Sequence, residues 1–249
     1  MRKRKERKDG MAQSGFHGLI GLGLAKSGHW KMHRSDTESR QSFAFGFVVG
    51  NVIPDADLLP LAITYLFDPA LAMRMHRTAT HSLVVIGLFT LISLALARTR
   101  RARCLFLGSA LGAVCHSLVD IAVWFSGVDL LWPMSHFGIP SEINLWKGIT
   151  VPRLVGNLLG AADFLAFGLF SLYLFNLSKT FETDTDFIPR LRTFTAFHFI
   201  TFSVYLVLAF ILSKTLFEIA QYALFVLVSF PITVYTIFRS RKTIQHLVA

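Results

Sequence analysis

The chain has 249 residues, of which 53% are hydrophobic and only 16% are charged, and its net charge is +10. A soluble domain is normally about 25% charged, so this composition excludes a protein whose whole surface faces water. The basic residues form short patches beside apolar runs, which indicates topogenic and lipid-facing charge rather than specific nucleic-acid binding. We therefore predict an all-α, polytopic helical membrane protein.

The N-terminal region combines a charged tail with a short apolar stretch. Residues 1–13 form a basic tail that we expect to be cytoplasmic. The apolar stretch that follows, up to residue 28, is rich in glycine and carries His17. We predict that it forms a short interfacial or re-entrant helix.

Six apolar runs follow, each about as long as a helix needs to cross the hydrocarbon core. With the basic patches around residues 98–103, 190–192 and 239–242 placed in the cytoplasm, they predict about six transmembrane helices and two cytoplasmic termini. Residues 14–140 would form the core that carries the site, and residues 141–249 a C-terminal helical membrane bundle. The runs are Ser42–Leu66, Leu83–Ala97, Cys104–Phe125, Leu154–Phe175, Phe194–Leu212 and Leu216–Phe238.

The first run is interrupted by the acidic motif Pro54-Asp55-Ala56-Asp57. A carboxylate inside the membrane costs several kcal/mol of free energy unless it is paired or faces a polar cavity. Asp55 and Asp57 are therefore candidate ligands. The alternative is that they only cap the next helix.

A second polar motif, His76-Arg77-Thr78-Ala79-Thr80-His81-Ser82, leads directly into the run at residues 83–97. Thr80 or Ser82 could cap that helix. One histidine here would be typical of a membrane interface, but two histidines beside Arg77 favour a binding site.

The third motif lies within the apolar run 104–125, where His116 and Asp120 are four residues apart. This spacing places both side chains on one helix face, within about 6 Å of each other. They could share a divalent cation, or the carboxylate could orient the histidine. The alternative is an intrahelical pair that only satisfies two buried polar groups. Gly108 and Gly112 lie on the same stripe and would let another helix approach closely.

In the predicted topology, Asp55, His81, His116 and Asp120 meet in the outer half of the membrane. His17 joins them only if its segment dips towards the site or if the orientation is reversed. Nitrogen and oxygen ligands without cysteine favour zinc, with manganese or iron as alternatives. Such a metal, with one open position, lowers the pKa of bound water and polarises a phosphoryl or acyl oxygen.

These motifs, in this order, resemble the YdjM-like family of inner-membrane-bound metal-dependent hydrolases, which is described as LexA-regulated. That family is distantly similar to zinc-dependent phospholipase C and single-strand nucleases. The resemblance covers roughly residues 14–140, and Thr78 departs from it because a glycine is expected there. It depends on His17, G-x-x-x-P-D-x-D (Gly50–Asp57), H-R-x-x-T-H-S (His76–Ser82), G-x-x-x-H-x-x-x-D (Gly112–Asp120) and a Pro-Ser loop at Leu131–Ser135.

The resemblance implies a metal site in a bacterial inner-membrane protein. Asp57 would be a further ligand or a general base, and Arg77 could bind an anionic phosphate. His136 could replace a later ligand of the soluble enzymes that has no match here. The implied ligands are His17, Asp55, His76 or His81, His116 and Asp120.

The leading functional hypothesis is a membrane-bound metal-dependent hydrolase that acts on a phosphoester in a lipid or lipid-linked substrate. Its partners would be membrane lipids and that substrate. The first alternative is a transport or structural membrane protein with an intramembrane His/Asp ion pathway. The second is a metal-binding protein with closed coordination and no turnover.

Overall fold

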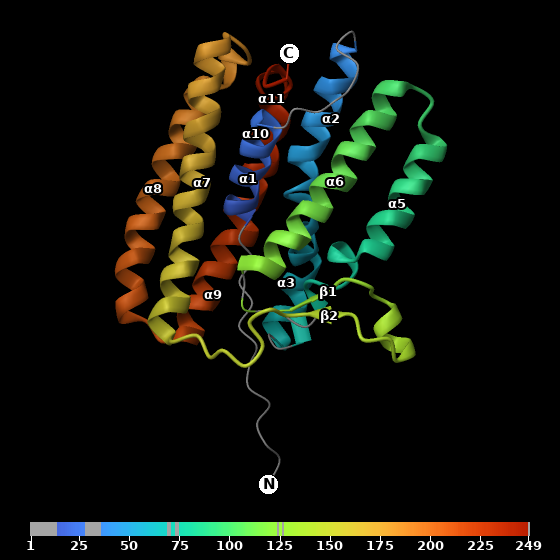
Figure 1. Ribbon diagram of the computed structural model, residues 1–249. Helices are drawn as coiled ribbons and strands as arrows, with labels where there is room; N and C mark the ends of the chain where they lie inside the picture. The colour runs from blue at the N-terminus through green and yellow to red at the C-terminus, as the bar shows by residue number, and fades with distance from the viewer. Residues whose placement is uncertain are drawn as a thin grey trace.

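The computed structural model describes residues 14–27, 36–68, 71–72, 75–123, 125 and 127–248, and the predicted basic tail lies outside them. The described chain is almost entirely helical, and its helices form one bundle (Figure 1). The longer helices are α1 (Ser14–Ser27), α2 (Thr37–Gly50), α3 (Leu58–Phe67), α5 (Leu83–Leu96), α6 (Arg100–Val123), α7 (Arg153–Phe181), α8 (Ile188–Ile211), α9 (Lys214–Leu224), α10 (Phe230–Arg239) and α11 (Arg241–His246). The short elements are η1 (Ile53–Asp57), η2 (Ala79–His81), η3 (Met134–Phe137), η4 (Thr185–Phe187), the π-helical η5 (Phe225–Ser229), and the antiparallel strands β1 (Val128–Asp129) and β2 (Glu142–Ile143).

The prediction of about six transmembrane helices is wrong. Among the described residues, four helical segments are long and apolar enough to cross a membrane, or five if a bent pair of helices counts as one span. The run at residues 83–97 falls short because α5 has only 14 residues. At 1.5 Å per residue it is about 21 Å long, against about 30 Å of hydrocarbon. The four segments are Arg100–Val123, Arg153–Phe181, Thr185–Ile211 and Lys214–Arg239.

The first predicted span is broken where the acidic motif begins. Helix α2 ends at Gly50, and the axis of the following segment, Ile53–Thr64, is turned by 45°. Pro54 explains the break, because proline lacks an N–H and cannot continue the preceding helix. Asn51 therefore lies at a corner of the chain, where its backbone carbonyl can meet another helix.

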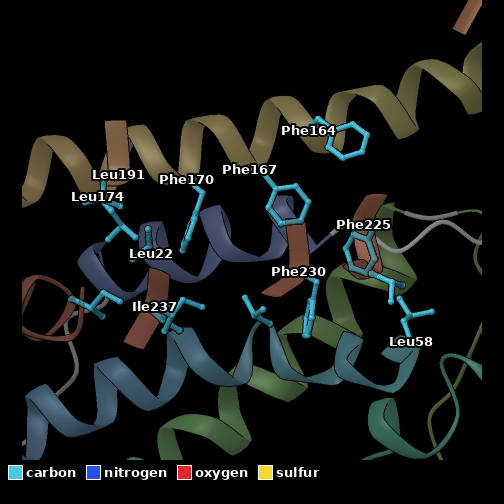
Figure 2. Close-up of a cluster of buried hydrophobic side chains, with 14 of the residues drawn as sticks. Leu22, Leu58, Phe164, Phe167, Phe170, Leu174, Leu191, Phe225, Phe230 and Ile237 are labelled. Atoms are coloured by element: carbon cyan, nitrogen blue, oxygen red, sulfur yellow. The ribbon is translucent and has the colours of Figure 1, made fainter. Parts of the chain in front are cut away.

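The predicted short N-terminal helix is present as α1, and it lies inside the bundle alongside α7. A Cβ at Gly15 would lie 2.7 Å from the backbone of α7 at Asp163 and Phe167, so only glycine permits this approach. Further along, Leu22 packs in one apolar cluster with Phe170 and Leu174 of α7 (Figure 2). This cluster contains residues from both sides of the boundary predicted between residues 140 and 141. The division of the chain at that point stays a prediction.

Helices α2 and α6 cross at backbone contact, as the glycine spacing predicts. A Cβ at Gly46 or Gly50 of α2 would lie 2.1 or 2.0 Å from a carbonyl oxygen of α6. A Cβ at Gly108 or Gly112 of α6 would lie 2.1 or 2.2 Å from a carbonyl oxygen of α2. Small residues at such a crossing allow close packing within a membrane. The crossing fixes the corner at Asn51 against the helix that carries His116.

The bundle has two distinct ends (Figure 1). The predicted basic patches lie together at one end, at the α5–α6 turn, around η4 and at α11, and we call this the basic end. Strands β1 and β2 lie at the opposite end, the hairpin end. Helix α1 begins inside the bundle, beside Asp163 and Phe167 of α7, and α11 lies at the basic end. That both termini are cytoplasmic stays a prediction, because the described chain begins only at Ser14.

Candidate metal centre

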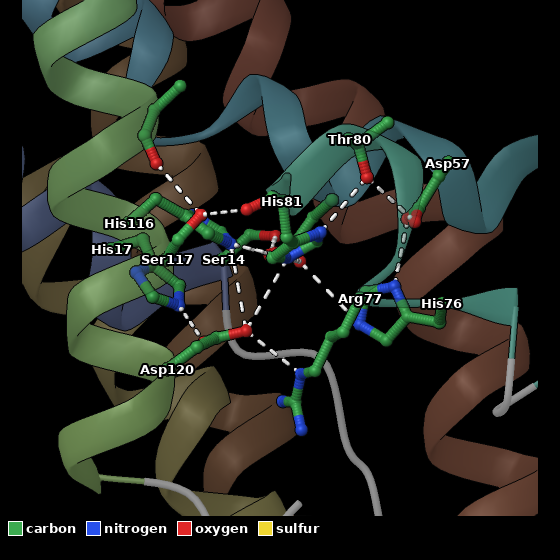
Figure 3. Close-up of polar contacts among 12 residues, drawn as sticks. Ser14, His17, Asp57, His76, Arg77, Thr80, His81, His116, Ser117 and Asp120 are labelled. Carbon is green, nitrogen blue, oxygen red and sulfur yellow. Dashed lines mark hydrogen bonds and ion pairs between the residues drawn. The ribbon is translucent and has the colours of Figure 1, made fainter. Parts of the chain in front are cut away.

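All six histidine and aspartate side chains predicted as ligands meet inside the bundle near the hairpin end (Figure 3). Their exposed fractions are 0–3%, so water does not reach them in this structure. Within each of two groups, the ligand atoms lie within 4.8 Å of one another. One group is His17, His116 and Asp120, and the other is Asp55, His76 and His81.

The two groups are joined through their carboxylates into one cluster. Oδ1 of Asp55 lies 3.5 Å from Nε2 of His116 and 3.8 Å from Nε2 of both His76 and His81. Oδ1 of Asp120 lies 2.9 Å from Nε2 of His17. Its Oδ2 lies 3.5 Å from Nε2 of His81. His116 and Asp120 therefore belong to a larger cluster and do not form only the intrahelical pair that was one alternative.

The ring of His116 is oriented by the corner of α2. Its Nδ1 lies 2.8 Å from the backbone carbonyl oxygen of Asn51, which can only accept a hydrogen bond. Nδ1 of His116 must therefore donate, so in the neutral ring Nε2 carries a lone pair and no proton. Metal-binding histidines typically use their second nitrogen in this way.

Asp57 and Thr80 orient the other two rings. Asp57 Oδ1 accepts from Nδ1 of His76 at 2.9 Å, and its Oδ2 accepts from the Thr80 hydroxyl at 2.9 Å. Because that hydroxyl donates to Asp57, it can only accept from Nδ1 of His81, which lies 2.9 Å away. The Nε2 atoms of both histidines are thus left as lone pairs that face Asp55. Asp57 makes no capping hydrogen bond to α3, so the capping alternative is wrong for this residue.

The space between two of the rings would suit a bound cation. Nε2 of His81 lies 3.1 Å from Nε2 of His116, and two lone pairs at that distance repel each other unless a proton on one ring or a cation lies between them. Two nitrogen ligands on one zinc ion, each bonded at about 2.0–2.1 Å, would lie about 3.3 Å apart.

The charge of the cluster is also compatible with a bound cation. The carboxylates of the buried Asp55 and Asp120 and of the partly buried Asp57 outnumber the buried guanidinium of Arg77. With neutral imidazoles the cluster therefore has a net charge of −2, which a divalent cation would balance.

Arg77 approaches the cluster with a constrained backbone. Its φ of 64° lies in the left-handed region, which is rare for residues other than glycine and is enriched at functional sites. Its Nε lies 2.8 Å from Oδ2 of Asp120, and its carbonyl oxygen accepts from the backbone N–H of Asp129. The fold therefore holds this guanidinium against a candidate metal ligand.

Helix α1 brings His17 to the cluster from its first turn. The first turn of α1 lies inside the bundle, beside Asp163 and Phe167 of α7. Whether its segment dips into the membrane or the orientation is reversed stays a prediction. The Ser14 hydroxyl donates to Oδ2 of Asp55, and the backbone N–H of Phe16 donates to Asp163 of α7 at 3.4 Å. A carboxylate at a helix N-terminus is favourable, since the first N–H groups there have no partners within the helix.

Sequence reasoning missed the residues that orient the ligands. The carbonyl of Asn51 and the hydroxyl of Thr80 act through contacts that no sequence spacing reveals. Asp163 is visible as a carboxylate within an apolar run, but nothing in the sequence links it to His17. His136, a possible further ligand, is exposed on η3 and belongs to neither ligand group among the described residues.

A family model described as YdjM inner membrane protein matches residues 11–214 of this chain. The match extends through α7 and α8, so it covers more than residues 14–140, to which the resemblance was confined. No curated protein and no solved structure matches the chain significantly.

Proposed function

Since the chain belongs to the YdjM inner membrane protein family, we propose that it is a metal-dependent hydrolase of the bacterial inner membrane. Its substrate would be a phosphoester in a lipid or lipid-linked molecule. The observation that carries this proposal is the 3.1 Å separation of the Nε2 atoms of His81 and His116, in a buried cluster with excess negative charge.

The two ligand groups would hold one or two divalent cations. Zinc suits imidazole nitrogen and carboxylate oxygen best, with manganese or iron as alternatives. When bound, such a metal supplies Lewis acidity and an activated water molecule.

The protein's own residues would orient the ligands and bind the phosphate. Asn51, Thr80 and Asp57 fix the tautomers of three histidines. Both oxygens of Asp57 are engaged in this way, which favours an orienting role over that of a general base. Arg77, beside Asp120, would bind the anionic phosphate through its planar guanidinium.

A second candidate function is metal binding without turnover. The nearly complete burial of all six ligands favours it, because a substrate must reach an open coordination position.

The deciding experiment is metal analysis of the purified protein followed by hydrolysis assays. We expect at least one equivalent of metal in the wild type and in His136→Ala, which removes an exposed histidine outside both groups. His116→Ala and Asp120→Ala should lose most of it. Equal, substoichiometric metal in all four proteins would refute the metal centre.

The assays would compare phosphoesters in lipid vesicles with water-soluble phosphoesters, each with and without a chelator. Metal-dependent hydrolysis of the lipid supports the proposal. Full metal content without hydrolysis of either substrate would favour the non-catalytic alternative.

A further inference from the structure

The segment between α6 and α7 packs directly on the motif that carries His76 and His81. The backbone N–H of Asp129 donates to the carbonyl oxygen of Arg77 at 3.1 Å, and that of Leu83 donates to Leu130 at 2.8 Å. The Ser82 hydroxyl donates to the carbonyl oxygen of Trp132 at 2.7 Å. We call residues 127–152 the roof segment, since they close the hairpin end of the bundle beside the cluster.

In the roof segment polar side chains pair with one another and apolar side chains face outwards, which is the reverse of what is expected for a loop in water. The carboxylate of Asp129 accepts from the hydroxyls of Ser135, at 2.7 Å, and of Ser141, which is buried. The large side chains that point outwards are mostly apolar. The apolar ones are Phe137 (76% exposed), Leu145 (65%), Ile149 (54%), Ile139 (48%), Ile143 (42%) and Leu131 (38%).

Many backbone N–H groups of the roof segment also have hydrogen-bond partners within the segment, as an environment with little water requires. The N–H groups of Leu130, Trp132 and Met134 donate to carbonyl oxygens within the segment. Further hydrogen bonds of this kind continue through η3 as far as the N–H of Ile139. Irregular backbone near lipid requires such internal partners, because no water is available to replace them. The side chain of Trp146 likewise donates to the carbonyl oxygen of Ala122 at 3.2 Å.

The apolar surface of the roof segment continues from surfaces that must face lipid. Helix α5 begins and helix α6 ends beside it, and their outward side chains, including Leu88 and Leu118, are 58% and 54% exposed. The exposed charged residues of the roof segment are Glu142 and Lys147, one of each sign. Long side chains of this kind can reach the headgroups while their neighbours stay among acyl chains.

We propose that the roof segment lies in the interface of the bilayer, with Phe137, Ile139 and Leu145 inserted among the lipids. A lipid headgroup would then meet the metal cluster from the bilayer side, below the roof, rather than from bulk water. The position of the segment follows from its own polarity, whereas the route for the headgroup rests on the proposed function.

Depth-dependent fluorescence quenching tests this position. In a Cys104→Ala/Cys115→Ala background, single cysteines at Phe137 and Leu145 carry an environment-sensitive dye in phosphatidylcholine/phosphatidylglycerol vesicles. Leu91 on α5, 68% exposed, serves as the lipid-facing control, and the exposed Lys242 on α11 as the opposite-end control. We expect nitroxide lipids to quench positions 137 and 145 at least twofold more strongly than aqueous iodide does, with an interfacial depth shallower than that of position 91.

Two results would overturn the proposal. Iodide quenching at 137 and 145 equal to that of the free dye would place the roof segment in water. Shielding that disappears when the protein is diluted in lipid would mean that a second copy covers this surface. Neither readout involves metal or hydrolysis, so a failure here leaves the metal centre intact, and a metal-free protein can still show the expected depth.

Discussion

Gly112→Ala should disrupt the proposed metal centre although Gly112 is not one of the proposed ligands. The added Cβ would lie 2.2 Å from the backbone oxygen of Phe47 and 2.9 Å from the backbone nitrogen of Asn51, whereas ordinary contact begins at 3.4 Å. Helices α2 and α6 must therefore separate by about 1 Å. The hydrogen bond between Asn51 and His116, now 2.8 Å long, would stretch beyond the range of a normal hydrogen bond.

The expected effect on stability has two opposing parts. Alanine favours a helix over glycine by about 1 kcal/mol, whereas overpacking a close contact costs about 1–3 kcal/mol. We therefore expect a net loss of up to about 2 kcal/mol. The loss of ring orientation should weaken metal binding about 10- to 100-fold, the usual effect of removing a group that orients a ligand.

The assay is metal titration by calorimetry together with thermal unfolding in detergent. Gly87→Ala in α5 is the matched control, because a Cβ there meets nothing within 4 Å. It should leave metal affinity unchanged and should not lower the unfolding temperature. Wild-type affinity and wild-type unfolding temperature in Gly112→Ala would refute the argument that the helix crossing sets the geometry of the site.

Three further predictions concern the groups around the cluster. Thr80→Val keeps the shape of the side chain but removes the acceptor for Nδ1 of His81, so metal affinity should fall about 10- to 100-fold in the same titration; an unchanged affinity would contradict the proposed tautomer. Asp163→Leu removes the carboxylate at the start of α1 and should lower both the unfolding temperature and metal affinity, with Asp163→Asn intermediate. Equal effects of the two variants would mean that the hydrogen bond to α1 does not matter. Removal of metal by a chelator should lower the unfolding temperature, and zinc at about 100 times its dissociation constant should restore about 2.7 kcal/mol. An unfolding temperature that responds to neither treatment would argue against a structural metal.

The sequence predicted which side chains would come together better than it predicted the number of spans. Buried His and Asp residues are costly in apolar helices, so Asp55, His81, His116 and Asp120 could be proposed as ligands from residue type alone, and the structure brings them together. The number of spans could not be read in the same way, because hydropathy does not reveal that α5 is too short or that Pro54 breaks the first run.

The sequence by itself determined that this is a helical membrane protein with ligand-type residues in its apolar segments. Only the tertiary structure decided how those residues meet, because their orientation depends on long-range contacts. Glycines at the α2–α6 crossing bring the carbonyl of Asn51 to His116, and Asp57 reaches back to orient His76 and, through Thr80, His81. Spacing along one helix fixes which side chains share a face, but the approach of two helices depends on every contact between them.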